Sequence, residues 1–340
     1  MTEFFLSYGL FLLKAITVLI VVLMIIGFAA TVKKKSKSGE LKIKHLNKKF
    51  QALKEAIQEA TLDKKVLKQE QKAKKKADKL KKKEAKTKDS DEVETSPRLF
   101  VIDFEGDIKA SSVPSLREEV SAILAASKPD DEVLIRLNNS GGVVHEHGLA
   151  ASQLVRLKQA ELSLTVAVDK VAASGGYMMA CVADRILAAP FAIVGSIGVV
   201  AQLPNFHRLL DRAGVDFEQQ TAGDYKRNVT MFGKNTDKER KQLKEQLEDI
   251  HDLFRGFVTD YRPQLDMDKV GTGQYWYGSR AKELNLVDDI MTSDDFLASV
   301  VNDKEIYQVS YEFEKSVMDK LSKGGAQLVE NMVSRLAKPE

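Results

Sequence analysis

The fold is decided by the stretch Glu132-Val-Leu-Ile-Arg-Leu-Asn-Asn-Ser-Gly-Gly142, in which a short apolar run ends in a polar, glycine-rich loop. Such a run, bounded by turn residues, is typical of a buried strand. The runs 99–104 and 162–168 have the same character, and helices are predicted between the three strands over residues 112–126 and 147–158. Strands that alternate with helices of this length predict βαβ units, a largely parallel sheet and an α/β domain.

The segment Ile186–Phe206 holds 21 uncharged residues, which is long enough to suggest a membrane span. Pro190, Gly195, Gly198 and Pro204 interrupt it, however. We therefore predict two short buried strands joined by a turn, and we keep the span only as the alternative.

Charge divides the 340-residue chain into three parts. Residues 1–32 are neutral, residues 33–88 carry 22 Lys against 7 acidic residues for +15, and residues 89–340 carry 29 Lys+Arg against 41 acidic residues for −12, which together give the net charge of +3. One cysteine, Cys181, excludes a disulfide framework and a multi-cysteine zinc cluster. No cofactor is predicted.

The neutral part predicts a membrane anchor. Residues 15–32 form an uncharged run that is long enough to cross a bilayer. Apolar residues before it extend the predicted lipid contact over residues 4–32. A cleaved signal peptide is the alternative, but the N-terminus is not basic and the apolar run is longer than usual. Eight Lys between Lys33 and Lys49 favour a cytoplasmic domain by the positive-inside rule, with a periplasmic domain as the alternative.

The basic part, residues 33–97, predicts a Lys-rich helical arm and a linker. Its apolar residues recur at helical spacing, at Ile43, Leu46, Phe50, Leu53 and Ile57. The arm is a solvated stalk or a surface for anionic lipid headgroups. Nucleic-acid binding is not expected, because Phe50 is the one aromatic residue among the lysines.

The domain itself is predicted over residues 98–300, after an acidic and polar linker at residues 87–97. Residues 301–340 follow as a C-terminal extension, in which residues 317–336 have the pattern of an amphipathic helix.

Two glycine-rich motifs follow strands of the domain. Ser174 lies in Val171-Ala-Ala-Ser-Gly-Gly-Tyr177, where a strand-to-helix turn can expose a serine hydroxyl as a nucleophile. An ordinary helix N-cap is the alternative role for this serine. The Gly141–Gly142 loop lets backbone N–H groups approach a ligand, as stabilising an acyl oxyanion requires, and a plain turn is its alternative. The carboxyl ends of neighbouring strands are where α/β sheets build their sites.

A serine nucleophile needs a base. His45, His145, His147, His207 and His251 have no local pattern that marks a triad member. A lysine can act instead where burial keeps its amine neutral, but most lysines are solvated, so spacing alone does not select one.

Four motifs taken together resemble the signal peptide peptidase A (protease IV) family. They are Asn139-Ser-Gly-Gly142, Ala173-Ser-Gly-Gly-Tyr177, Gly195-Ser-Ile-Gly-Val199 and Gly223-Asp-Tyr-Lys-Arg227, and the resemblance extends over residues 98–295. The N-terminal span, the Lys-rich extension and the single copy of the domain are most similar to the SohB-like branch of that family.

The resemblance implies a ClpP/crotonase-like fold and a membrane-bound serine endopeptidase. It implies Ser174 as nucleophile, Lys226 as general base, Ser196 as the residue that positions the lysine, and an oxyanion hole at Gly141, Gly142 and Gly175. It also implies a homo-oligomeric ring in the bacterial inner membrane, in which the dyad can be completed between neighbouring copies. Substrates would be unfolded, apolar or signal-peptide-derived peptides.

The chain departs from the family pattern at two places. Asn285 stands where the family often has Gly, and Ser140 stands where many members have Pro. Because of Ser140, the resemblance does not define the shape of the oxyanion loop.

Two other functions are alternatives. One is an acyl-CoA enzyme of the crotonase fold, which forms no serine acyl-enzyme, and the other is a catalytically silent membrane scaffold.

Overall fold

The computed structural model describes residues 8–18, 21, 39–63, 66, 97–223, 225–226 and 229–313. Leu41–Tyr311 is one compact unit, and residues 1–40 are grouped with residues 312–340 in another. Residues 8–18 are helical. No helix within the described residues has the length and apolar character that a membrane crossing needs. Most of the predicted anchor, and all of the predicted C-terminal helix at 317–336, lie outside the described residues.

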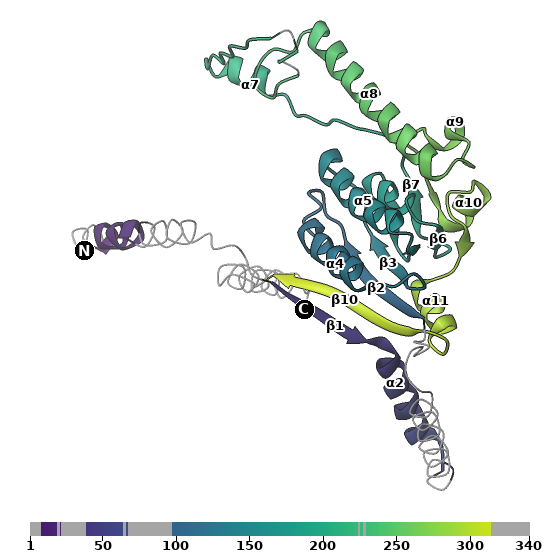
Figure 1. Cartoon of the computed structure of the whole chain (residues 1–340). Helices are drawn as coiled ribbons and strands as arrows, with labels where there is room; N and C mark the ends of the chain where they lie inside the picture. The colour runs from purple at the N-terminus through teal and green to yellow at the C-terminus, as the bar shows by residue number, and fades with distance from the viewer. Residues whose placement is uncertain are drawn as a thin grey trace, which may run out of the picture. The chain divides into compact units, whose positions relative to one another are not determined.

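A seven-stranded sheet forms the centre of the larger unit (Figure 1). Its order is β1 (Gly39–His45), β10 (Glu305–Phe313), β2 (Arg98–Glu105), β3 (Glu132–Asn138), β4 (Ser163–Val168), β6 (Arg185–Ala188) and β9 (Asp289–Ile290). All pairs from β10 to β9 are parallel. The predicted α/β class with a largely parallel sheet is therefore confirmed.

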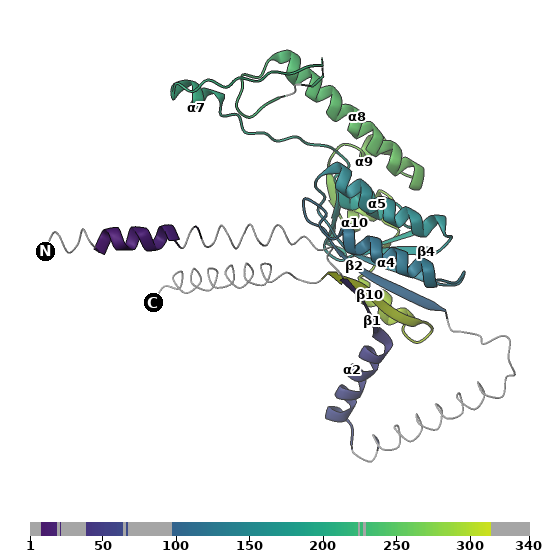
Figure 2. The ribbon, with the colours of Figure 1, turned by 60° about the vertical axis from the view of Figure 1, so that its left-hand side comes forward.

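Helices cover one face of this sheet. They are α4 (Val113–Ala126), α5 (Val144–Gln159) and α6 (Gly175–Ala180), and Figure 2 shows α4 and α5 side by side on it. Alternate residues of each strand, such as Phe104, Ile135 and Val166, enter the large core beneath them. The opposite face has a smaller core under α11 (Ser293–Val300).

Ile186–Phe206 forms two short strands, as predicted. The first, β6, lies in the large sheet, and the second, β7 (Ile193–Gly195), joins a three-stranded sheet of order β5-β7-β8. In that sheet β5 (Val171–Ala173) runs parallel to β7, and β8 (Tyr275–Tyr277) runs antiparallel to it. The second sheet positions two of the predicted site residues, because β5 ends directly before Ser174 and β7 ends directly before Ser196.

The prediction of a helix through Ile43 is wrong. Residues 39–45 form the strand β1, and the helix α2 begins only at Leu46 and ends at Thr61. Apolar Leu41 and Ile43 alternate with charged residues, which is also a strand pattern, and lysines are usual on an edge strand. Leu46 enters the small core, and the Asn47 side chain bonds the backbone of Val301, Lys304 and Ile306. This part of the predicted arm therefore packs on the domain.

A long excursion leaves the core between β7 and β8. It contains α7 (His207–Arg212) and the 25-residue helix α8 (Asp237–Tyr261), and α7 lies at the outer end of this segment, away from the sheet, in both views (Figures 1 and 2). Phe254 and Val258 near the other end of α8 are buried in the large core. Arg262 just beyond it donates to both carboxylate oxygens of Asp288 at 2.9 and 2.8 Å. We call residues 207–261 the excursion α7–α8, and it is fixed to the core at one end of α8. The short helices α9 (Met267–Val270) and α10 (Gly278–Glu283) complete the unit.

One buried carboxyl makes the stability of the domain depend on pH. Glu119 on α4 is 5% exposed and accepts the backbone N–H of Tyr311 on β10 at 2.8 Å. Burial raises the pKa of Glu119 to about 7, and the charge of Asp103 adds to the rise. Folding therefore favours the protonated acid, and its stabilisation is complete below the unfolded pKa and is lost as pH rises through 7.

We expect Glu119→Gln to remove this loss, because an amide keeps the acceptor oxygen for Tyr311 without ionising. Relative to the parent, the variant should gain unfolding free energy between pH 5 and pH 8, by on the order of 3 kcal/mol. Urea unfolding at the two pH values measures it. Glu118→Gln, at an exposed neighbour on the same helix, is the control. An equal difference at both pH values would contradict the assignment.

Candidate active site

Ser174 stands at the strained turn between β5 and α6. Its φ is 53°, a left-handed value that non-glycine residues rarely adopt and that clusters at functional sites. It occupies the N-cap position of α6, but its side chain makes no capping hydrogen bond. The N-cap alternative is therefore wrong for this hydroxyl, and the strained turn presents it to a cavity instead.

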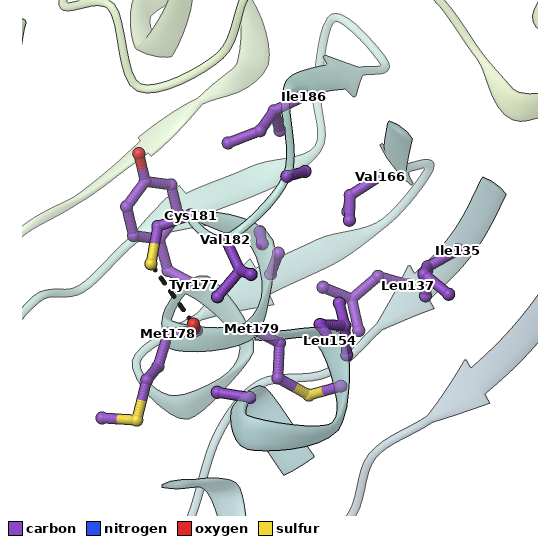
Figure 3. Packing of buried hydrophobic residues seen from close by; sticks show 14 of the residues in the cluster. Ile135, Leu137, Leu154, Val166, Tyr177, Met178, Met179, Cys181, Val182 and Ile186 are labelled. Atoms are coloured by element: carbon purple, nitrogen blue, oxygen red, sulfur yellow. Dashed lines mark hydrogen bonds between the residues drawn. The ribbon is translucent and has the colours of Figure 1, made fainter. Parts of the chain in front are cut away.

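The helix that follows Ser174 is entirely buried, which holds the turn in place. Figure 3 shows Met179 beside Leu154 of α5, and Tyr177 and Cys181 belong to the same buried cluster. The Tyr177 hydroxyl donates to the Leu286 carbonyl at 2.9 Å, and the Cys181 thiol donates to the Met178 carbonyl at 3.2 Å. Burial raises the pKa of the Cys181 thiol, so this cysteine is not a nucleophile.

The cavity beside Ser174 has a volume of about 610 Å³. It brings together residues that are far apart in the sequence, namely Ser140, Gly141, Gly142, Ser174, Ser196 and His251. The carboxyl ends of β3, β5 and β7 supply the first five, and α8 supplies the histidine. The two glycine-rich motifs thus meet at one place.

Gly141 lies against the Ser174 turn so closely that no side chain fits. Its φ is +86°, and a Cβ there would lie 2.7 Å from the Gly175 nitrogen and 2.8 Å from the Ser174 Cβ. The Gly141 N–H donates to the Asn139 side-chain oxygen at 2.9 Å. Neither Gly142 N–H nor Gly175 N–H has a hydrogen-bond acceptor among the described residues. These two free donors therefore flank the Ser174 turn.

Ser196 borders the same cavity in a second strained turn. Its φ is 55°, and its N–H donates to the Gln274 carbonyl at 2.7 Å at the end of the small sheet. Positive φ occurs at five non-glycine positions in the part of the chain that the structure describes, and two of them are Ser174 and Ser196. Both serines of the predicted constellation are therefore held in rare backbone conformations.

Lys226 does not border this cavity. It is exposed, and its N–H donates to the Gly223 carbonyl within the excursion α7–α8. The Phe206 N–H donates to the Met231 carbonyl at 2.7 Å, which closes the loop that carries Lys226 beside α7. His251 at the cavity follows Asp237 near this loop by 14 positions along α8, a length of about 21 Å at the helical rise.

The histidines considered as bases lie in different parts of the fold. His45 contacts Glu305 at 2.5 Å, His145 is exposed, and His207 begins α7 on the excursion. His251 lines the cavity, but its Nε2 lies 3.1 Å from the Ile197 carbonyl. Within the ranges that the structure covers, no histidine hydrogen-bonds the Ser174 hydroxyl.

Local sequence pattern does not predict how the loop is supported. Asn139 belongs to the first glycine-rich motif, and its buried side chain accepts a hydrogen bond from the loop. His251 lines the cavity, although its Nε2 lies against the Ile197 carbonyl and makes no hydrogen bond with Ser174. No local pattern could have placed it at the cavity, because the approach of α8 depends on distant packing.

Two family models match the chain. The model of the peptidase family S49 N-terminal region matches residues 3–154, and the model of peptidase family S49 matches residues 156–307. A Haemophilus influenzae protein named "Probable protease SohB" is 48% identical over 97% of this chain and 95% of its own length. A protein of the same name from Buchnera aphidicola subsp. Acyrthosiphon pisum is 51% identical over 71% of each chain.

Among solved structures, a membrane-bound stomatin-specific protease in complex with a substrate peptide aligns with a TM-score of 0.42 at 12% identity. The alignment covers 66% of this chain and 96% of that one.

Proposed function

The chain is a serine-type protease that belongs to peptidase family S49, and we propose from this premise that it cleaves peptides through a dyad of Ser174 and Lys226. The single observation that carries the proposal is the Ser174 turn. Its serine has a strained backbone, an uncapped side chain and two free backbone N–H groups beside it. That is the arrangement that nucleophilic acyl transfer needs.

The proposed reaction has two steps. The neutral Lys226 amine takes the Ser174 proton as Oγ attacks the peptide carbonyl carbon, and the oxyanion accepts hydrogen bonds from Gly142 and Gly175 N–H. The lysine ammonium then gives its proton to the leaving amine as the C–N bond breaks, which leaves the acyl-enzyme. Water then attacks the ester carbonyl carbon as it gives a proton to the Lys226 amine. The lysine ammonium returns that proton to Ser174 Oγ as the ester C–O bond breaks, which releases the carboxylic acid product and regenerates both residues. Ser196 holds the amine in place, and Gly141 contributes its shape rather than its N–H.

We further propose that a neighbouring copy of the chain completes the dyad in a homo-oligomeric ring. The position of Lys226 on the excursion α7–α8, away from the cavity of its own copy, supports this. The excursion also exposes large apolar side chains, among them Leu209 at 63% and Tyr225 at 69%. Apolar surface of this kind is typical of protein interfaces.

The finer features of the fold belong to the same proposal. Repeated strand–helix units with a small second sheet fit a ClpP/crotonase-like fold. Residues 1–32 would anchor the chain in the bacterial inner membrane, and residues 98–300 would hold the peptidase site, extended by the strands β1 and β10. Charge favours a cytoplasmic site.

Substrates are proposed to be unfolded, apolar or signal-peptide-derived peptides. Val144, Val199 and Val200 line the cavity beside Ser174, and such a lining favours apolar side chains. β8 is an edge strand of the small sheet, and an extended peptide can add to such an edge.

Labelling in cells tests the nucleophile and the membrane side together. A fluorophosphonate should modify Ser174 and no other serine, as mapped by mass spectrometry, because only an activated serine attacks phosphorus.

Protease accessibility tests the membrane side. If the site is cytoplasmic, added protease should digest the domain in lysed spheroplasts and leave it intact in unbroken spheroplasts. Absence of label on Ser174 in folded protein would refute the nucleophile, and digestion in intact spheroplasts would place the site in the periplasm.

A further inference from the structure

The buried side chain of Asn139 connects the two halves of the site. Its oxygen accepts the Gly141 N–H at 2.9 Å, and its nitrogen lies 3.3 Å from the Met179 sulfur on α6. Its backbone N–H donates to the Val171 carbonyl at 2.8 Å, and its carbonyl accepts the Ala173 N–H at 3.0 Å. Asn139 thus ties the Gly141–Gly142 loop to the strand that ends at Ser174.

His147 holds this asparagine from the first turn of α5. The ring is fully buried, and its Nε2 lies 3.2 Å from the Asn139 side-chain oxygen. That atom is an oxygen because it already accepts the Gly141 N–H, so a hydrogen on Nε2 is what makes the contact attractive. The other ring nitrogen, Nδ1, lies 3.0 Å from the Val143 carbonyl, which is also an acceptor. A neutral imidazole has one N–H and can donate to only one of these two oxygens.

The same ring also supports the second half of the site. A Cβ on Gly175 would lie 2.5–2.6 Å from three atoms of His147, so the ring and the Gly175 backbone are in close contact. One side chain therefore supports both free donors: Gly142 through Asn139 and Gly141, and Gly175 by direct packing.

We propose that His147 is a positioning residue of the oxyanion hole, an inference that rests on the function proposed above. It touches neither substrate nor the reacting atoms. Its Nε2–H fixes the amide of Asn139, which fixes the loop, so that the two N–H groups converge before substrate arrives. Donors held in place in advance stabilise a transition state more than donors that must reorganise.

A pair of substitutions separates the two ring nitrogens. In His147→Gln the amide nitrogen takes the place of Nε2, and in His147→Asn it takes the place of Nδ1. We expect His147→Gln to stay within about threefold of the parent kcat and His147→Asn to lose about 10- to 100-fold, with KM nearly unchanged in both. The affinity of a peptide aldehyde, whose adduct carries the oxyanion, should fall as kcat/KM falls.

Gln153→Met on the same helix is the matched control. This residue is also buried and polar, but its hydrogen bonds are to Leu149 and Arg156. It should lower the melting temperature without lowering kcat. If kcat in the two His147 variants simply follows their melting temperatures, the ring is only packing and the proposal is refuted.

Hydrogen exchange distinguishes failure of this proposal from failure of the proposed function. The Gly141 N–H should exchange faster in His147→Asn than in His147→Gln, whether or not any peptide is cleaved. Equal exchange in the two variants refutes the positioning role. A parent that exchanges as expected but neither hydrolyses peptides nor reacts with fluorophosphonate would leave the support of the loop standing and refute the Ser174 chemistry.

Discussion

Ser174→Ala should reduce peptide hydrolysis by at least about 10⁴-fold, the scale of loss seen when a catalytic serine is removed. The methyl group has no oxygen to attack the carbonyl, so only binding and the two backbone donors remain. The fold should not change, because the Ser174 side chain makes no capping hydrogen bond and alanine adopts the same strained φ at a similar cost. Peptide hydrolysis and circular dichroism together measure both expectations.

Ser152→Ala provides the matched control for this variant. Ser152 lies on α5, and its hydroxyl donates to the Gly148 carbonyl at 2.8 Å rather than bordering the cavity. Its activity should equal that of the parent. Retention of more than about one per cent of activity in Ser174→Ala, with the protein folded, would show that another residue is the nucleophile.

Mixing two inactive variants should restore activity. Lys226→Ala and Lys226→Arg should each lose about 10³-fold or more, because a methyl accepts no proton and a guanidinium stays protonated at all working pH values. In an equal mixture, Lys226→Ala chains keep Ser174 and Ser174→Ala chains keep Lys226. If neighbouring copies share the dyad, a site is complete where a Lys226→Ala chain supplies Ser174 and its Ser174→Ala neighbour supplies Lys226. About a quarter of the sites in a random ring should then work.

The mixture must be unfolded and refolded together, so that the chains exchange between rings. Lys238→Ala, at an exposed lysine in the first turn of α8, is the control and should keep full activity. No recovery in mixed rings of proven composition would place both residues of the dyad in one copy. The excursion α7–α8 would then have to fold back on its own cavity.

Alternation of strands and helices could be predicted because it depends on local pattern. The apolar run before Asn138, the run after Leu162 and the punctuated segment from Ile186 are short and bounded by turn residues, which favours strands. The pattern of residues 39–45 does not distinguish a helix from a strand, because Ile43 fits the apolar face of a helix as well as the alternation of a strand. Pairing beside β10, in which Glu305 follows His45 by 260 residues, decided in favour of the strand.

The sequence by itself determined the α/β class, the family and the motifs around Ser174, because these depend on residue types at short spacing. Only the tertiary structure decided that the Gly141 N–H is already used, that the His147 ring lies against Asn139 and Gly175, and that Lys226 lies off the cavity. Each of these depends on contacts between segments brought together by burial of the core. No spacing along the chain encodes the distance between such segments.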